Sequence, residues 1–307
     1  FNRTKANVIS KFGNLKNQTI EIENITPDSN KKNQLKSEFY LPNREKIQTS
    51  KYQLISNVDE LMKWSDEINK IGTVAIDCET NSLSAVDAQI VGFSMSLDNS
   101  KSCYIPLTHN DQSVEQIKLD DFITIVKKFL EDPSILKIGQ NIKYDFIILA
   151  NLGIMIKNID DTMLMSYVLK TGNRGHNLDE LALDYLSHST IKFTDVTNVN
   201  KKKISFQDVD IKSALNYAAE DSDVTYRLWE ILKIELIKNK LYDFYFFVEK
   251  PLVEIIAVME INGCKIDNEE LRNLSNLFSK KIEIIEKKIF KLSSEEFNIA
   301  SPKQLGE

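Results

Sequence analysis

The sequence is poor in cysteine and histidine, and it has no long apolar run. Its three cysteines, Cys78, Cys103 and Cys264, lack the spacing of a disulfide framework or a zinc site. We therefore expect free thiols in a reducing cytoplasm. No basic start leads into an apolar segment, and the longest aromatic run, residues 244–248, is too short to span a bilayer. Neither a signal peptide nor a membrane partner is predicted.

Several kinds of catalytic motif are also missing. The nine glycines form no glycine-rich phosphate loop. None of the histidines, His109, His176 and His188, has a serine or cysteine partner in a nucleophile motif, so we interpret them as surface or packing residues. The formal charge of −6 argues against a protein that simply coats nucleic acid. If DNA is the substrate, bound cations must supply part of the attraction.

Composition and periodicity divide the chain into three parts. Residues 1–50 are rich in Lys, Asn, Gln and Ser with few regularly spaced apolar positions, so we interpret them as a linker. Residues 51–240 alternate predicted strands and helices, which is typical of the α/β class. After a boundary placed near Lys240 the alternation ends, and residues 241–307 carry two long helical patterns.

The predicted elements follow from hydrophobic periods of two and of 3.6 residues. Asn57 followed by Glu60 is typical of a helix N-cap with its capping-box partner. Strands are predicted over residues 52–55, 73–78, 90–97, 102–107 and 135–139. Helices are predicted over residues 57–71, 113–130, 144–152, 162–169, 178–186, 211–237, 244–262 and 268–292.

Carboxylates are the chemically informative residues. Asp77 and Glu79 lie two apart in a predicted strand, so both leave the same face. Tyr217 and Asp221 lie four apart in a predicted helix and share one face of it. Asp145 lies in a stretch between strand and helix, where it can be aimed at the other acids. Each pattern alone is common in proteins without a catalytic role, and only their order and spacing together make them informative.

Clustered acids repel one another and lose hydration unless a cation compensates them. Mg²⁺ and Mn²⁺ prefer oxygen ligands, so the cluster predicts divalent metal. Two such ions about 4 Å apart can activate a water and stabilise the leaving oxygen of a phosphoryl displacement. The predicted chemistry is therefore that of a metal-dependent nuclease.

Three segments resemble the exonuclease motifs of the family A DNA polymerases, the bacterial-type DNA polymerase I family. They are residues 75–83 (AIDCETNSL), 139–145 (GQNIKYD) and 217–223 (YAAEDSD). Further segments that resemble this family are residues 161–164, 175–179 and 297–305, while residues 1–14 loosely resemble the tail of a 5′-nuclease domain. The resemblance runs from about Tyr52 to the end. It implies a ribonuclease H-like 3′-5′ exonuclease fold, with a mixed sheet flanked by helices, followed by the helical start of a polymerase domain.

The resemblance also implies residue roles. Two divalent ions, Mg²⁺ or Mn²⁺, would be bound by Asp77, Glu79, Asp145 and Asp221, and Tyr217 would orient the attacking water. Leu83 and Phe193 match positions that wedge the terminal bases, although both could equally be core residues. The residues that the resemblance implies in contact with the DNA strand are Gln140, Asn141, Tyr144 and Arg174. Cys78 departs from the family, which more often has Thr there, and should point away from the metals.

The implied function is removal of nucleotides from a single-stranded or frayed DNA 3′ end. We expect a cytoplasmic monomer whose partner is the rest of a polymerase chain, with no polymerase activity here because the groups for that reaction would lie beyond Glu307. One alternative is a ribonuclease D-like exonuclease acting on RNA, which the segment from Phe244 onward disfavours. Another is a DNA-end-binding domain that binds metal too weakly for turnover.

Overall fold

The computed structural model describes residues 46–98, 101–111, 113–172, 175–199 and 202–306. Most of the predicted linker lies outside these residues. Arg174, which was predicted to contact the DNA strand, also lies outside them. Contacts group Arg44–Glu307 into one unit. Within the described part of the chain, no helix combines the length and apolar character that crossing a bilayer requires.

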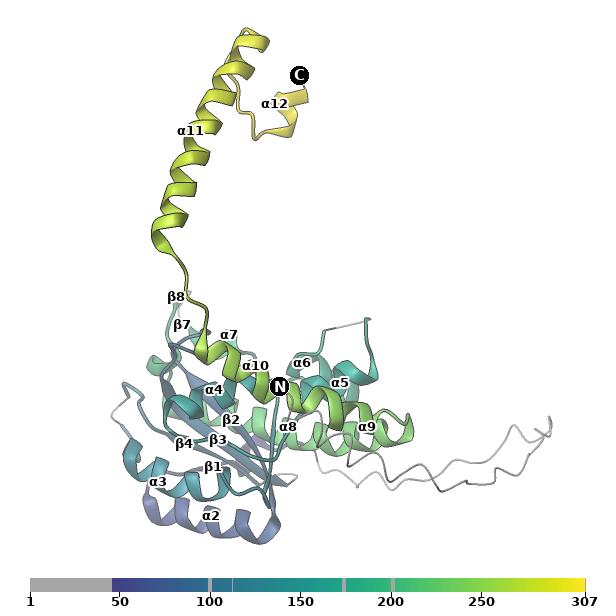
Figure 1. The fold of residues 1–307 in the computed structure, drawn as a ribbon. Helices are drawn as coiled ribbons and strands as arrows, with labels where there is room; N and C mark the ends of the chain where they lie inside the picture. Colours follow the sequence, from purple (N-terminus) through teal and green to yellow (C-terminus); the bar gives the residue numbers. More distant parts are fainter. Residues whose placement is uncertain (1–45, 99–100, 112, 173–174, 200–201, 307) are drawn as a thin grey trace, which may run out of the picture. The chain divides into compact units, whose positions relative to one another are not determined.

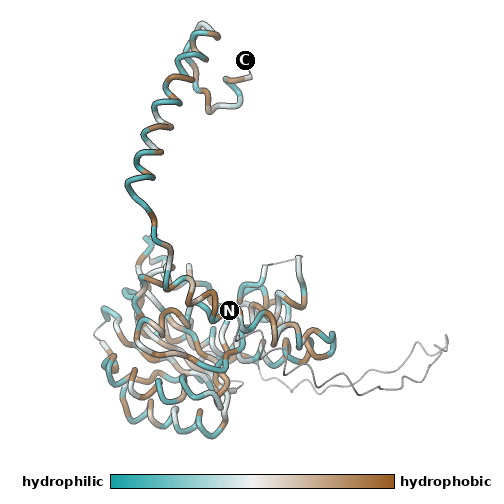
Figure 2. The backbone as a smooth tube through the Cα atoms, in the orientation of Figure 1, coloured by the Kyte–Doolittle hydropathy of each residue, from teal (hydrophilic) through white to brown (hydrophobic). Residues whose placement is uncertain are grey.

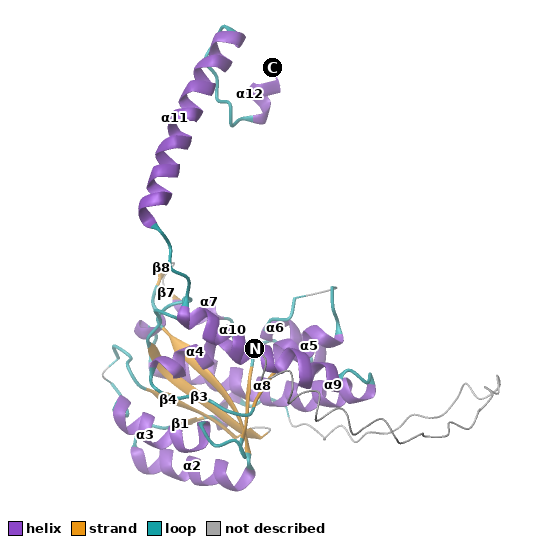
Figure 3. Ribbon diagram, viewed as in Figure 1, coloured by secondary structure: helices purple, strands orange, loops and turns teal. Residues whose placement is uncertain are grey.

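A six-stranded mixed sheet forms the centre of the fold, with the order β1-β4-β3-β2-β5-β6 (Figures 1 and 3). The strands are β1 (Gln53–Leu54), β2 (Thr73–Thr80), β3 (Ile90–Asp98), β4 (Lys101–Pro106), β5 (Leu136–Gly139) and β6 (Ile159–Asp161). β3 runs antiparallel to both of its neighbours, whereas the other pairs are parallel. The predicted mixed sheet flanked by helices is confirmed. β6, only three residues long, was not predicted.

Helices cover both faces of the sheet. In the part before Lys240 they are α2 (Val58–Ile71), α3 (Leu119–Leu130), α4 (Lys143–Asn151), α5 (Thr162–Leu169), α6 (Leu178–Leu181), the π-helical turn η3 (Ala182–Leu186), α7 (Phe193–Thr197) and α8 (Ile211–Lys238). Short 3₁₀ turns are η2 (Thr49–Lys51) and η4 (Phe206–Asp208), and β7 (Asn198–Val199) pairs with β8 (Lys202–Lys203). Helix α2 and helix α3 pack together, and each alternates apolar with polar residues (Figure 2).

The alternation of side chains between the two faces of β2 decides where its acids point. Ile76 and Cys78 belong to the large core cluster that also contains side chains of α2, α3 and α4. Ala75 belongs instead to a cluster with Tyr226 of α8. Because successive side chains of a strand leave opposite faces, Asp77 and Glu79 share the α8 face with Ala75. Burial of the intervening apolar residues therefore fixes the direction of the two acids.

Two of the helices predicted before Lys240 differ from the structure. The helix predicted over residues 113–130 begins only at Leu119, because the Gln116 amide donates to the carbonyls of His109 and Asp111 at 3.0 Å and holds a loop there. The helix predicted over residues 178–186 changes after one turn into a π-helical turn. By contrast, the Asn57 cap is confirmed, since its side chain accepts the Glu60 N–H at 3.0 Å.

The last fifth of the chain is helical, as predicted. It comprises α9 (Tyr242–Phe244), the π-helical turn η5 (Tyr245–Glu249), α10 (Lys250–Asn262), α11 (Asn268–Ser293) and α12 (Pro302–Gly306). Val253 and Ala257 of α10 belong to the same core cluster as β2, and α10 contacts α4. Helix α11 buries none of its residues within the described chain. The segment through α10 thus packs on the α/β fold, while the boundary near Lys240 stays a prediction.

Candidate active site

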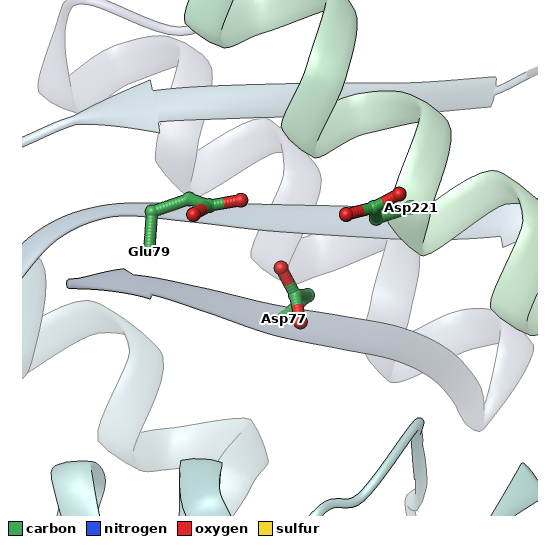
Figure 4. Close-up of side chains that lie close together, drawn as sticks. All are labelled: Asp77, Glu79 and Asp221. Atoms are coloured by element: carbon green, nitrogen blue, oxygen red, sulfur yellow. The ribbon is translucent and has the colours of Figure 1, made fainter. Parts of the chain in front are cut away.

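Three carboxylates converge between the sheet and α8. Asp77 and Glu79 reach from β2, and Asp221 reaches from α8 (Figure 4). One ligand oxygen of each lies within 4.8 Å of the others. A divalent ion bound by oxygen ligands needs this kind of spacing, because its ligands surround a single centre at 2.0–2.6 Å. The residues predicted from two separate periodicities therefore meet at one point.

Glu79 supplies a test of whether a cation fits. Its side chain is buried, and Oε1 has no hydrogen-bond partner among the described residues. A buried carboxylate oxygen without a partner costs free energy that a hydrogen bond or a cation would recover. This donor set, all oxygen and all anionic when deprotonated, suits Mg²⁺ or Mn²⁺.

Burial and mutual repulsion change the acidity of the cluster. Burial raises the pKa of Asp77 to about 6. It also raises the pKa of Glu79 and of Asp221 well above the ordinary range, and in both cases the Asp77 charge adds to the effect. Without a cation, burial and mutual repulsion therefore favour the forms of these acids that keep their protons. A divalent ion would displace them, so metal binding and proton release are coupled.

Asp145 approaches the same site by another route. It lies in the first turn of α4, is buried, and its Oδ1 accepts the N–H of Cys78 at 2.8 Å. Burial, followed by the Asp77 charge, raises the pKa of Asp145. Its oxygens are not within the spacing that joins the other three acids. The structure thus places Asp145 against the backbone of β2, and its role as a fourth ligand stays a prediction.

Tyr217 lies one turn before Asp221 on α8. Its ring meets Phe206 at 5.9 Å and Phe193 at 6.1 Å between centroids. Burial, and next the Asp221 charge, raises the pKa of the Tyr217 hydroxyl well above its ordinary value. The phenol therefore keeps its proton at neutral pH and remains a hydrogen-bond donor.

A cavity of about 400 Å³ unites these groups. Every predicted site residue within the described chain lines it. They are Asp77, Glu79, Leu83, Gln140, Asn141, Tyr144, Asp145, Phe193, Tyr217 and Asp221. Carboxylates therefore share one cavity with an aromatic and aliphatic rim.

The two predicted wedge residues differ in their surroundings. Leu83 is 93% exposed, so the alternative that it is a core residue is wrong. Phe193 is 39% exposed and stacks on the buried Phe206, with ring planes at 11°. An exposed Leu and a half-exposed Phe on the rim of one cavity offer apolar surfaces to which flat bases can bind.

Two of the side chains predicted to contact the DNA strand are already hydrogen-bonded within the protein. Gln140 donates from Nε2 to the His176 carbonyl at 2.7 Å and accepts from Thr162 Oγ1 at 2.5 Å. The Tyr144 hydroxyl donates to the Ser82 carbonyl at 2.5 Å. Both polar groups are therefore used within the protein, where they shape the cavity wall. Direct contact of these side chains with a strand stays a prediction.

Comparison with known proteins decides the family. A family model described as 3′-5′ exonuclease matches residues 52–237. The chain belongs to the 3′-5′ exonuclease family. This exonuclease is 39% identical over 276 residues to the DNA polymerase I of Rhizobium leguminosarum, covering 84% of this chain and 27% of that protein. It is 40% identical over 249 residues to the DNA polymerase I of Pseudomonas aeruginosa, covering 79% and 27%.

The exonuclease thus spans about a quarter of the length of these relatives. Among solved structures, it is similar to the POL domain of Pol1 from M. smegmatis in complex with DNA primer-template and dNTP, with a TM-score of 0.67. That match has 21% identity and covers 82% of this chain and 40% of the other. At this identity it shows a shared fold.

Asp161 organises the exonuclease cavity, although it was assigned no role from the sequence beyond its place in the family-like segment 161–164. Its carboxylate accepts four backbone N–H groups, those of Asn141, Ile142, Met163 and Leu164, at 2.8–3.2 Å. Two of these bonds cap α5, and the other two hold the turn before α4, where Asn141 has a φ of 59°. An Asp directly before an apolar helix is typical of an N-cap, and this signal could have drawn attention to Asp161.

Asp161 is in turn connected to the helices after Lys240. The Tyr245 hydroxyl accepts the Asp161 N–H at 2.9 Å and donates to Asp160 Oδ1 at 3.1 Å. Lys250 pairs with the same Asp160 oxygen at 3.0 Å. Tyr245 lies beyond the residues that the family model matches. The C-terminal helical segment therefore supports the turn that carries Asn141.

Proposed function

We propose that this exonuclease hydrolyses the 3′-terminal phosphodiester of single-stranded or frayed DNA, as the proofreading part of a DNA polymerase I chain. The observation that carries the proposal is the convergence of Asp77, Glu79 and Asp221 around an unpartnered buried oxygen of Glu79. The relatives named DNA polymerase I favour DNA over RNA as substrate.

The site would use two divalent ions, Mg²⁺ or Mn²⁺, held by Asp77, Glu79, Asp221 and Asp145. When bound, such ions supply an acidified water and stabilise charge on the leaving oxygen. Asp145 would have to share its carboxylate between this role and the Cys78 amide, to which its Oδ1 is bonded. Its second oxygen leaves room for both.

The remaining residues of the chain act on water and substrate. Tyr217, protonated and one turn from Asp221, would orient the attacking water by a hydrogen bond. Leu83 and Phe193 would separate and stack the terminal bases, so that the scissile linkage reaches the acids. Reaching the cavity requires bases to leave a duplex stack, which costs a few kcal/mol per step and favours ends that are already frayed.

The setting of the reaction is also part of the proposal. The protein would act as a monomer, since the acids Asp77, Glu79 and Asp221 converge within a single chain. The partner would be the rest of the polymerase chain, and the location would be the cytoplasm, where bacterial DNA is replicated.

A nuclease assay tests the proposal against its alternatives. Short 5′-labelled DNA and RNA strands would be incubated with the chain and Mn²⁺ or Mg²⁺, with chelator and Asp221→Ala as matched controls. We expect stepwise shortening of DNA from the 3′ end that stops in chelator and in the variant. Preference for RNA would support the ribonuclease D-like reading. Binding of DNA ends without cleavage would support the non-catalytic reading.

A further inference from the structure

Lys203 is a basic residue on the wall of the exonuclease cavity. It lies at the end of β8, where it pairs with Asn198 of β7. The following residues Ile204, Ser205 and Phe206 also line the cavity. Lys202, its neighbour on the same strand, is equally exposed but does not line it. The strand thus separates two adjacent lysines into one that faces the site and one that does not.

The position of Lys203 is fixed relative to the predicted wedge Phe193. The Ile204 N–H donates to the carbonyl of Thr197 at 2.8 Å, and the Thr197 hydroxyl donates to the Phe193 carbonyl at 2.8 Å. The residue after β8 is therefore bonded to the last residue of α7, whose hydroxyl bonds back to the first residue of that helix. A ligand stacked on Phe193 would have Lys203 on the same wall.

The Lys203 ammonium group has no ion pair or hydrogen bond with any described residue. It is also the single basic side chain among the described residues that line the cavity. Here the ammonium remains available to an external anion.

Charge balance indicates which anion that is. The four predicted carboxylates would be neutralised by two divalent ions, which leaves no excess positive charge for a strand that brings one negative charge per phosphodiester. Grooves that bind single strands combine stacking surfaces with basic groups along the backbone. Phe193 supplies the stacking surface, and Lys203 is the available basic group beside it.

We propose that Lys203 binds a phosphodiester of the single strand whose terminal bases stack on Phe193. The proposal rests on the proposed function for the identity of the strand. Lys203 would not contact the metals or the attacking water, so it would contribute to binding and positioning of the strand rather than to the chemical step.

The test measures binding separately from cleavage. A fluorescent single-stranded oligothymidylate would be titrated by anisotropy with Ca²⁺, at salt concentrations from 50 to about 300 mM, with strand integrity checked by gel. We expect Lys203→Ala to weaken binding about tenfold, as for loss of one charge-assisted contact. The slope of log affinity against log salt should become shallower by about 0.7, the value for one phosphate contact of a single strand.

Lys202→Ala is the matched control, since it removes the same charge from the same strand outside the cavity. It should leave affinity and slope unchanged, and Lys203→Arg should retain both. In cleavage, Lys203→Ala should raise KM with little change in kcat. An unchanged slope in Lys203→Ala, or an equal loss in Lys202→Ala, would overturn the assignment. If Lys203→Ala showed the weaker binding and shallower slope expected while the wild-type chain cut no strand, the proposed function would be wrong but the assignment of Lys203 would stand.

Discussion

The backbone N–H of Cys78 donates to Oδ1 of Asp145 at 2.8 Å, across 67 positions of sequence. This bond ties the first turn of α4 to β2, between Asp77 and Glu79. Asp145 therefore has a structural role in addition to its predicted role as a ligand. The two roles can be separated, because an amide oxygen can replace a carboxylate oxygen as acceptor but carries no charge.

Asp145→Asn and Asp145→Ala should accordingly differ. Asp145→Ala leaves the buried Cys78 N–H without an acceptor, and we expect it to lower the free energy of unfolding by about 1–3 kcal/mol. Asp145→Asn should retain most of the stability, yet both variants should lose cleavage activity by at least about 10²-fold. Urea denaturation in chelator and single-turnover cleavage would measure the two effects. Activity near wild type in Asp145→Asn would exclude Asp145 as a ligand.

Substitutions of Asp221 and Tyr217 should have different effects on activity and on metal binding. Asp221→Ala removes a predicted metal ligand, so we expect loss of activity by several orders of magnitude and weaker Mn²⁺ binding. Tyr217→Phe removes one hydrogen bond to water, and its loss should be about 10²-fold or less with Mn²⁺ affinity almost unchanged. Calorimetric Mn²⁺ titration and single-turnover rates would compare them. Equal loss of Mn²⁺ binding in both variants would contradict these roles.

The raised pKa of Asp77 makes stability depend on pH. Because its pKa is about 6 in the folded chain and 3.8 in the unfolded reference, the folded state binds more protons between these values. The Asp77 contribution to stability therefore falls as pH rises from about 4 to 6. Asp77→Asn should gain stability relative to wild type across this window and hold that gain above it. Urea titrations of both metal-free proteins would show this, and a difference that shrinks with rising pH would be the opposite result.

Leu83 should matter for substrate but not for stability. Since its side chain is 93% exposed, Leu83→Ala should change the free energy of unfolding by no more than about 0.5 kcal/mol. Wild type should cut mismatched 3′ ends faster than matched duplex, and Leu83→Ala should reduce this preference. Met62→Ala, at an exposed apolar position of α2, is the control and should alter neither quantity. If wild type cut paired and mismatched 3′ ends at equal rates, the role of Leu83 as a wedge would be contradicted.

Tyr245 offers a test of how the C-terminal helices support the site. Tyr245→Phe leaves the buried Asp161 N–H without its acceptor, so we expect a loss of about 1–3 kcal/mol in the free energy of unfolding. Tyr242→Phe is the matched control, because the Tyr242 hydroxyl makes no hydrogen bond with the described residues. Urea denaturation of the two variants would compare them. Equal free energies of unfolding for the two variants would show that the Tyr245 hydrogen bond makes no net contribution to stability.

Local periodicity in the sequence determined much of the secondary structure and of the side-chain directions in this protein. The alternation of β2 placed Asp77 and Glu79 on one face, and the helical period of α8 placed Tyr217 one turn from Asp221. These relationships hold within a few residues, where backbone geometry alone sets side-chain direction. The α/β class, most strands and the Asn57 cap followed from the same short-range rules.

Only the tertiary structure decided which distant groups meet. Three features depend on segments brought together by packing: the Cys78 bond to Asp145, the bonds of Asp161 to the Asn141 and Ile142 amides, and the place of Lys203 on the cavity wall. β6 escaped prediction for the same reason, since it is stabilised by pairing with β5. The loop held by Gln116 escaped prediction for another reason, because its hydrogen bonds to His109 and Asp111 are short-range side-chain contacts that hydrophobic periodicity does not reveal. Side-chain direction is a local property of a helix or strand, whereas hydrogen-bond partners and burial are set by the whole chain.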